Sequence, residues 1–202
     1  MPELRDNHPE IYRWIVAHAP EKGKALDIGC GDGELLALLG KEKRMEGTGI
    51  ELSQDSAILA IQRGLTVHHG NVEEGLDHYS DQCFDLVILS LSLQETRRPL
   101  EVLLECFRVG RQVIVVFPNF GHWRARWQLG VLGRAPMTCT LPFPWYESPN
   151  YHYITVADWE DFCRQERWQI LDMGFAATAR PVRWFPRWRS EVAMYLLEPL
   201  SR

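Results

Sequence analysis

The sequence predicts an α/β fold built around a doubly wound, mostly parallel sheet of seven strands. Two observations predict it. Between residues 24 and 117, short apolar runs alternate with segments whose apolar residues have helical spacing, as in a parallel sheet assembled from βαβ units. Two later segments, 168–173 and 191–197, have strand character and are expected to close the sheet as an antiparallel pair.

The length of 202 residues predicts one domain over residues 1–202, with an insertion at 118–153. Hydrophobic residues make up 46% of the chain and charged residues 24%, which is typical of a globular protein. The net charge of −5 argues against a nucleic-acid partner. No apolar run approaches ~20 residues, so no membrane partner is expected, and the polar first ten residues lack the apolar core of a secretory signal.

The cysteines are scattered, odd in number and without a C-x-x-C pair. They indicate free thiols in a reducing cytoplasm and no metal site. Cys30 lies in a glycine-rich turn, where a small side chain that fills the turn is the simpler interpretation than a reactive thiol. The five are Cys30, Cys83, Cys106, Cys139 and Cys163.

The first element expected is a short helix. Asn7 is placed as its N-cap, with Glu10 three residues later. Ile11, Trp14 and Ile15 then form an apolar stripe at helical spacing. This helix is placed to cover a cofactor site, although packing alone accounts for Trp14.

A strand, a tight turn and a helix follow, over residues 24–39. The turn contains Gly29, Gly31 and Gly33, after a strand that ends near Asp27. Glycines let the backbone bend and a ligand approach the helix N-terminus, although such turns also occur without a ligand. Position 34 is Glu, so the third glycine comes one residue too early for the dinucleotide motif.

The strand-Asp-x-Gly-x-Gly-x-Gly pattern resembles the S-adenosylmethionine (SAM) loop of class I methyltransferases, whose fold is Rossmann-like. The resemblance implies that the glycines at 29, 31 and 33 lie against the methionine end of SAM. It also implies that Asp27 holds the turn and the amino group of the cofactor.

A second strand, 47–52, ends in Glu51. A carboxylate there has two acceptor oxygens for the two ribose hydroxyls of a nucleoside cofactor. An ordinary acid at a helix start is the alternative. Glu51 would serve NAD as well as SAM, and Asp27 with the early third glycine favours SAM.

Two further segments are expected at the same edge of the sheet. A helix over 55–63 and a strand over 65–69 precede Asn71 and Val72, and a strand over 83–89 precedes Ser90. Ligands bind where such strands end. In the resembled family an Asp at position 71 often binds the adenine amino group, and Asn71 has an oxygen that accepts the same bond. A turn-forming asparagine is an equal alternative.

The next elements are a helix over 99–109, a strand over 112–117 and a helix over 155–166 with Thr155 as N-cap. Between the last two lies the insertion, which is aromatic and arginine-rich and contains a short helix over 124–131. It is interpreted as a lid or docking surface, with a satellite aromatic core as the alternative. His122 and Tyr146 are the candidate catalytic bases, and a structural histidine is the alternative role for His122.

Arginine and aromatic residues alternate again over residues 180–189, a composition typical of protein–protein contacts. With the insertion, this segment is expected to dock a partner protein.

Several segments together resemble the MetW family of methionine biosynthesis proteins over nearly the whole chain. The more specific of them are the Pro-Asn-Phe-Gly-His-Trp run at 118–123 and the Pro-Phe-Pro-Trp-Tyr run at 142–146. The resemblance implies a class I methyltransferase-like fold, SAM as cofactor, and work with the homoserine O-acyltransferase MetX.

Two functions remain open from the sequence. One is SAM-dependent methyl transfer to a small molecule, in which positioning supplies much of the rate. The other is a SAM-sensing subunit that activates or regulates the acyltransferase, which is favoured as the role in the pathway because SAM lies downstream of methionine.

Overall fold

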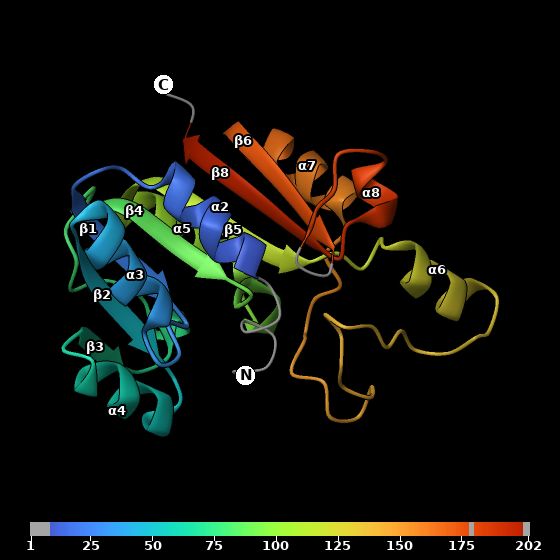
Figure 1. The fold of residues 1–202 in the computed structure, drawn as a ribbon, viewed down its shortest axis with the longest axis horizontal. Coiled ribbons are helices and arrows are strands. Elements are labelled where there is room, and N and C mark those ends of the chain that lie inside the picture. The colour runs from blue at the N-terminus through green and yellow to red at the C-terminus, as the bar shows by residue number, and fades with distance from the viewer. Residues whose placement is uncertain (1–8, 178–179, 200–202) are drawn as a thin grey trace.

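The computed structural model describes residues 9–177 and 180–199. Its strands form one sheet in the order β3-β2-β1-β4-β5-β8-β6-β7 (Figure 1). Strands β1 to β5 pair in parallel, whereas β8 is antiparallel to β5 and β6 is antiparallel to β8. The strands are β1 (Gly23–Ile28), β2 (Met45–Glu51), β3 (Thr66–His69), β4 (Phe84–Ser90), β5 (Gly110–Pro118), β6 (Trp168–Ala177), β7 (Arg180–Pro181) and β8 (Val192–Pro199).

The doubly wound, mostly parallel sheet and its late antiparallel pair are therefore confirmed. The predicted number of strands differs, since the sheet has eight strands rather than seven. The additional strand is β7, two residues long, which pairs with Ala176 and Ala177 at the end of β6. A two-residue strand has no periodicity to recognise, and its Arg-Pro sequence is typical of an exposed edge.

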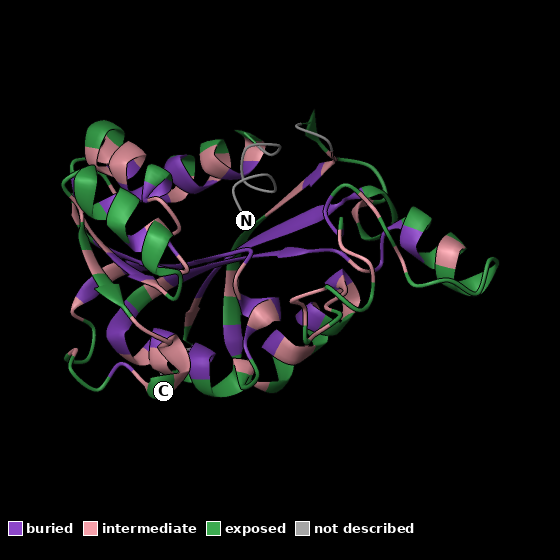
Figure 2. Ribbon diagram, turned by 90° about the horizontal axis from the view of Figure 1, so that it is seen from below, coloured by how far each residue is buried: buried purple, intermediate pink, exposed green. Residues whose placement is uncertain are grey.

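Helices cover both faces of the sheet, and Figure 2 shows the buried strands between the two layers. Helices α2 and α3 pack on one face, α5 and α7 pack on the other, and α4 lies along β2 and β3. Within the described ranges, no helix has the length and apolar character needed to cross a membrane. The helices are α2 (Pro9–His18), α3 (Glu34–Lys43), α4 (Gln54–Gln62), α5 (Pro99–Val109), α6 (Trp123–Gly130), α7 (Val156–Gln165) and α8 (Pro186–Arg189), with short 3-10 turns η1 (Val72–Glu74) and η2 (Leu93–Glu95).

Local sequence explains where several helices begin. The predicted cap of α7 is confirmed, because Thr155 Oγ1 accepts a bond from the Asp158 backbone N–H at 3.2 Å. Ser53 caps α4 in the same way, accepting from Ser56 N at 3.4 Å. The predicted cap Asn7 lies outside the described residues.

Helix α2 is fixed by its contacts with β6. His18 Nε2 lies 2.8 Å from an Asp172 carboxylate oxygen, and the Trp14 ring stacks on the His18 ring. Gly174 leaves room for that indole, because a Cβ at this position would lie 2.5 Å from Trp14 Nε1. Trp14 therefore has the packing role that the sequence offered as its alternative.

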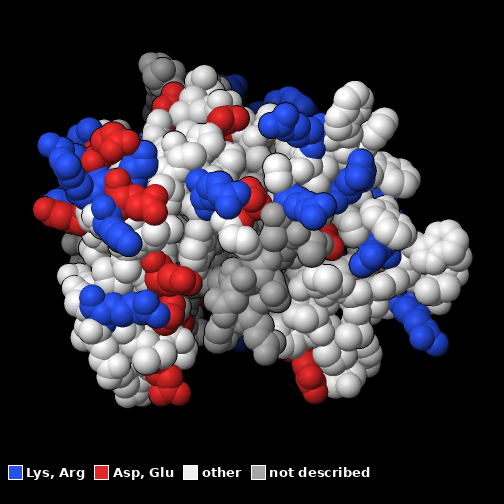
Figure 3. Space-filling view, in the orientation of Figure 1, with Lys and Arg blue, Asp and Glu red and all other residues white. Residues whose placement is uncertain are grey.

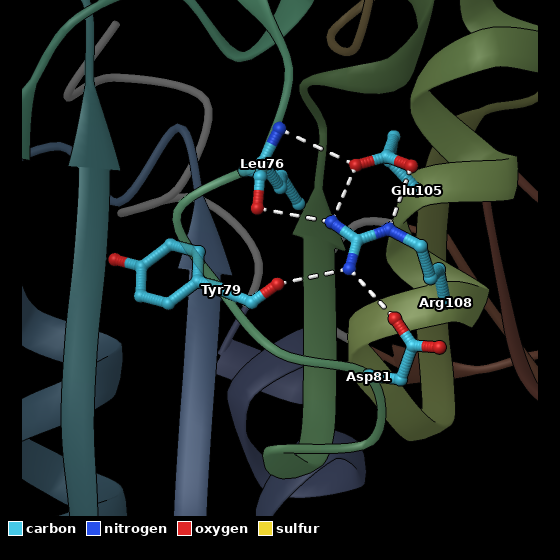
Figure 4. Close-up of polar contacts among 5 residues, drawn as sticks. All are labelled: Leu76, Tyr79, Asp81, Glu105 and Arg108. Carbon is cyan, nitrogen blue, oxygen red and sulfur yellow. Dashed lines mark hydrogen bonds and ion pairs between the residues drawn. The ribbon is translucent and has the colours of Figure 1, made fainter.

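One partly buried arginine network ties the connection before β4 to α5 (Figure 4). The Arg108 guanidinium donates to both carboxylate oxygens of Glu105 at 2.9 and 2.7 Å and to Asp81 at 2.9 Å. It also donates to the backbone carbonyls of Leu76 and Tyr79. The bond from Arg108 lowers the pKa of Glu105, so the pair stays ionised at neutral pH.

We expect Arg108→Ala to lower the free energy of unfolding by about 2 kcal/mol, because it leaves two carbonyls and a half-buried carboxylate without their donor. Arg164 is the matched control, since among the described residues its side chain bonds only to Asp161, on the exposed surface. Arg164→Ala should change stability by less than about 0.5 kcal/mol. Urea unfolding of both variants measures the difference, and equal stabilities would contradict the structural role given to Arg108.

Candidate functional site

The predicted glycine loop joins β1 to α3 at the carboxyl edge of the sheet. Gly29, Gly31 and Gly33 all have positive φ angles, of 74°, 60° and 80°. A side chain at position 33 would also strike the packed chain, because its Cβ would lie 2.3 Å from Leu65 Cδ1. The loop therefore needs glycine for its backbone conformation, and at position 33 also for space.

Glu51 holds this loop in place. One carboxylate oxygen accepts a bond from Gly31 N at 2.7 Å, and the other accepts from Ser53 N at 2.8 Å. Backbone bonds from Gly29 N and Cys30 N to the Ile50 carbonyl, at 2.8 and 3.1 Å, extend the same attachment. Glu51 thus has a structural role beside the predicted ribose contact, and each oxygen retains a second lone pair for a ligand donor.

Cys30 fills the space behind the loop, as the simpler interpretation predicts. It is buried, and a Cβ at Gly49 on the neighbouring strand would lie 2.4 Å from its sulfur. Each of the five cysteines is free. In the part of the chain that the structure describes, no three His, Cys, Asp or Glu side chains gather in a way that would hold a metal ion.

The other predicted cofactor residues lie at the same sheet edge. Asp27 is buried near the end of β1, in register with Gly49 of β2 and Ile88 of β4. Ser90 ends β4, is buried, and its hydroxyl has no hydrogen-bond partner among the described residues. A buried hydroxyl without a partner at a ligand-binding edge is a candidate for a ligand bond.

Asn71 and Val72 follow β3. The Asn71 side-chain oxygen accepts a bond from Glu73 N at 3.0 Å and so caps η1, while Val72 packs against the main core. The turn-forming role offered for Asn71 is therefore present, and its adenine contact stays a prediction.

The structure separates the two candidate bases. His122 is 4% exposed and precedes α6. Tyr146 lies in the exposed part of the insertion, with its ring edge-on to Trp145. No hydrogen bond between described residues joins either side chain to the glycine loop.

Burial lowers the pKa of His122, the charge of Glu191 opposes this shift, and the charge of Arg124 adds to it. Its Nδ1 atom has no hydrogen-bond partner in the described ranges. The ring is therefore neutral at pH 7, the state in which a histidine acts as a base.

Gln94 and Asn119 are two polar residues whose roles the sequence did not predict. The side-chain amide of the buried Gln94, in η2 after β4, donates to the Leu91 carbonyl at 2.8 Å, and the Gln94 backbone carbonyl accepts from Tyr151 N and His152 N. Asn119 follows β5 and bonds Ser190, whereas its side-chain oxygen accepts from Gly121 N. The Gln94 backbone and the Asn119 side chain therefore fasten the insertion to the sheet. The position of Asn119 directly after β5 was the available signal for that residue.

Comparison with known proteins identifies the family. The model of the family described as "Methionine biosynthesis protein MetW" matches residues 5–197. The chain belongs to the MetW family. The class I methyltransferase-like fold and the place in methionine biosynthesis that the sequence predicts are thereby confirmed.

A curated relative of this MetW chain is the "Bifunctional methionine biosynthesis protein MetXA/MetW" of Rhodopirellula baltica. It is 34% identical over 160 residues, which cover 75% of this chain and 26% of the relative. The chain therefore spans about a quarter of the length of that protein.

Solved structures share the fold at low sequence identity. A putative SAM-dependent methyltransferase from Listeria monocytogenes has a TM-score of 0.70 at 14% identity, with 100% of both chains covered. A SAM-dependent methyltransferase from Mesorhizobium loti has a TM-score of 0.68 at 16% identity, with 93% of this chain and 95% of that chain covered. These structures show that the MetW chain has a methyltransferase fold.

We expect His122→Asn to make stability less dependent on pH between pH 7.0 and 5.5. Burial lowers the pKa of His122 in the folded chain, whereas in the unfolded chain His122 has the ordinary histidine pKa of about 6.5. As the pH falls, the unfolded chain therefore takes up a proton at His122 before the folded chain does. This uptake lowers the wild-type free energy of unfolding by at most about 1.4 kcal/mol per pH unit. Urea unfolding at both pH values measures the slope, and equal slopes in the two proteins would show that His122 is not held neutral.

Proposed function

We propose that this MetW chain binds SAM at the edge where β1, β2 and β4 end, and that it acts with or regulates a homoserine O-acyltransferase, MetX. The relative in which MetXA and MetW share one polypeptide carries the proposal, because covalent fusion keeps two proteins together. We place this activity in the cytoplasm, and the free cysteines support that location.

The fit of the site to SAM rests on the loop geometry. Three glycines with positive φ leave the backbone open to a close ligand, and α3 begins directly after them with Gly33 as an N-cap that has no side-chain acceptor. In the proposal, the methionine end of SAM lies along Gly29, Gly31 and Gly33, with Asp27 toward its amino group. Ser90 offers to the same ligand its hydroxyl, which has no hydrogen-bond partner in the described part of the chain.

The remaining proposed contacts involve the nucleoside. Glu51 takes the ribose hydroxyls through lone pairs that its bonds to Gly31 and Ser53 leave available. Asn71 and Val72 lie beyond β3, where the adenine of a nucleoside cofactor is expected. With these assignments the proposed cofactor site extends across four neighbouring strands, in the order β3-β2-β1-β4.

Methyl transfer to a small molecule is the second candidate function. The observation that favours it is the buried, neutral His122, whose Nδ1 atom has no hydrogen-bond partner among the described residues. The cavity where β4 and β5 meet the insertion, lined among others by Leu91, Gln94 and Pro118, has room for about one water, so the insertion would have to open to admit an acceptor. His122 is the proposed base, with its neutral ring, and Tyr146 would act only if the exposed part of the insertion closed over the acceptor.

We expect Glu51→Ala to weaken SAM binding at least tenfold, because two bonds to a charged acceptor, each worth about 1.5–3 kcal/mol, are removed and the loop loses its attachment. Glu51→Gln keeps one acceptor oxygen and should lose less. Glu42→Ala, an exposed change on α3, is the control and should bind SAM as the wild type does. Calorimetry with SAM and NAD measures both affinities. Unchanged affinity in Glu51→Ala would refute the ribose contact, and tighter binding of NAD would refute the cofactor class.

The choice between the two functions needs both proteins. We expect this chain to co-purify with the homoserine O-acyltransferase of the same organism and to change its acyl-transfer rate when SAM saturates the site. With methyl-labelled SAM and cell extract, the label should remain in SAM. Failure to bind the acyltransferase would refute the partner, and label transferred to a small molecule would establish the methyltransferase alternative.

A further inference from the structure

The insertion contains a groove that none of the proposed SAM residues lines. Its volume is about 420 Å³, and its walls come from α6, the loop after it and the segment before α7. Two of the apolar side chains that line it face solvent, since Leu129 is 63% exposed and Trp145 is 76% exposed. Large apolar side chains left in water at the rim of a groove usually mark a binding surface. The lining includes Phe120, Ala125, Arg126, Leu129, Leu141, Phe143, Trp145 and Tyr153.

Hydrogen bonds hold these walls in place. The Gln128 side chain on α6 makes two bonds to the Met137 backbone, at 2.9 and 2.6 Å, and so fixes the loop against the helix. On the opposite wall, Phe120 N donates to the Ile154 carbonyl at 3.0 Å, and the Phe120 ring packs edge-on against Tyr153. The groove is therefore built by the chain itself and is ready to receive a side chain.

The surroundings of the groove are strongly cationic. Residues 118–153 and 180–189 hold seven arginines and one acidic residue, in a chain whose net charge is −5. The two segments adjoin, because the Arg126 guanidinium lies 5.1 Å over the Trp188 ring and Asn119 bonds the Arg187 and Ser190 carbonyls. In Figure 3 the charged side chains on the side that carries α6 and α8 are mostly blue, set among uncharged residues, whereas the opposite side mixes blue and red.

Several of these arginines lack a carboxylate partner. Within the described ranges, Arg124, Arg126 and Arg134 form no ion pair, whereas Arg187 pairs with Glu160 at 2.5 Å. Arg134 directly precedes the lining residues Ala135 and Pro136. Unpaired guanidinium groups around an apolar groove match an acidic surface that carries an apolar side chain.

We propose that the groove receives an apolar side chain from an acidic segment of the homoserine O-acyltransferase, with the surrounding arginines pairing with its carboxylates. This proposal rests on the proposed function for the identity of the partner. Aromatic residues and arginine are enriched where binding energy concentrates, and a preformed pocket at the centre of a charged rim is the usual setting of such an anchor. The charge of the rim selects an acidic partner and speeds its approach.

The test compares four variants in binding to the acyltransferase, measured by surface-immobilised kinetics at two salt concentrations. Leu129→Asp places a charge on the groove wall, and Arg134→Glu reverses one charge of the rim. The matched controls are Leu59→Asp, an exposed leucine on α4, and Lys22→Glu, an exposed cation before β1. Because all four substituted side chains are exposed, the melting temperatures of these variants should stay close to that of the wild type. A fifth variant, Phe143→Ala, widens the groove without adding charge.

We expect Leu129→Asp and Phe143→Ala to weaken binding at least tenfold, mainly through faster dissociation. Arg134→Glu should slow association and reduce its salt dependence. Both controls should bind as the wild type does, and all variants should keep their SAM affinity.

Two results would overturn the proposal while leaving the partner in place: groove variants that bind as well as the wild type, or wild-type binding that salt does not weaken. A wild-type chain that fails to bind the acyltransferase refutes the partner and the groove assignment together. A single-stranded RNA probe of 20 nucleotides is the last arm. If the RNA binds the wild-type chain more tightly than the acyltransferase does, and Arg134→Glu abolishes this RNA binding, the surface is a nucleic-acid site instead.

Discussion

The carboxylate of Glu51 makes the attachment on which the rest of the site depends. It lies at the end of β2 and accepts the backbone N–H groups of Gly31 and Ser53, so it joins the glycine loop to the start of α4. Without such an acceptor, a loop of three glycines with positive φ would have many other conformations, because glycine restricts the backbone least. The same residue thus shapes the loop and stands where a ribose is expected. An acid at this position serves folding, and in the proposed function the same carboxylate also binds the ligand.

The insertion depends on a second set of attachments. Gln94 accepts two backbone bonds from Tyr151 and His152 after β4, and Asn119 connects the end of β5 to the turn before β8. The Gln94 backbone carbonyl and the Asn119 side chain make these bonds, and both residues are buried, so the bonds form away from competing water. Beyond them the insertion has little regular structure except α6, and most of its large rings face solvent. A satellite aromatic core is therefore not what these residues form. They present a surface, fixed to the sheet at both of its ends.

Sequence and structure agree most closely where periodicity and capping act locally. The helix predicted over 99–109 is α5 with the same bounds, and Thr155 caps α7 as predicted. Agreement is weaker where tertiary contacts decide where a strand begins and ends. The strand predicted over 112–117 extends over Gly110–Pro118, because its neighbours β4 and β8 pair along its whole length. The two-residue β7 was missed for the same reason, since only the adjacent end of β6 makes those residues a strand.

By itself, the sequence determined the α/β class, the glycine loop, the acid after the second strand and the MetW family, because each depends on residue type and spacing along the chain. Only the tertiary structure decided that Glu51 bonds the loop, that His122 is buried and neutral, and that the arginine-rich segments 118–153 and 180–189 adjoin beside a groove. These features join residues that lie far apart in the chain. Their energies come from burial and from contacts made only after the sheet has assembled, and no local pattern records them.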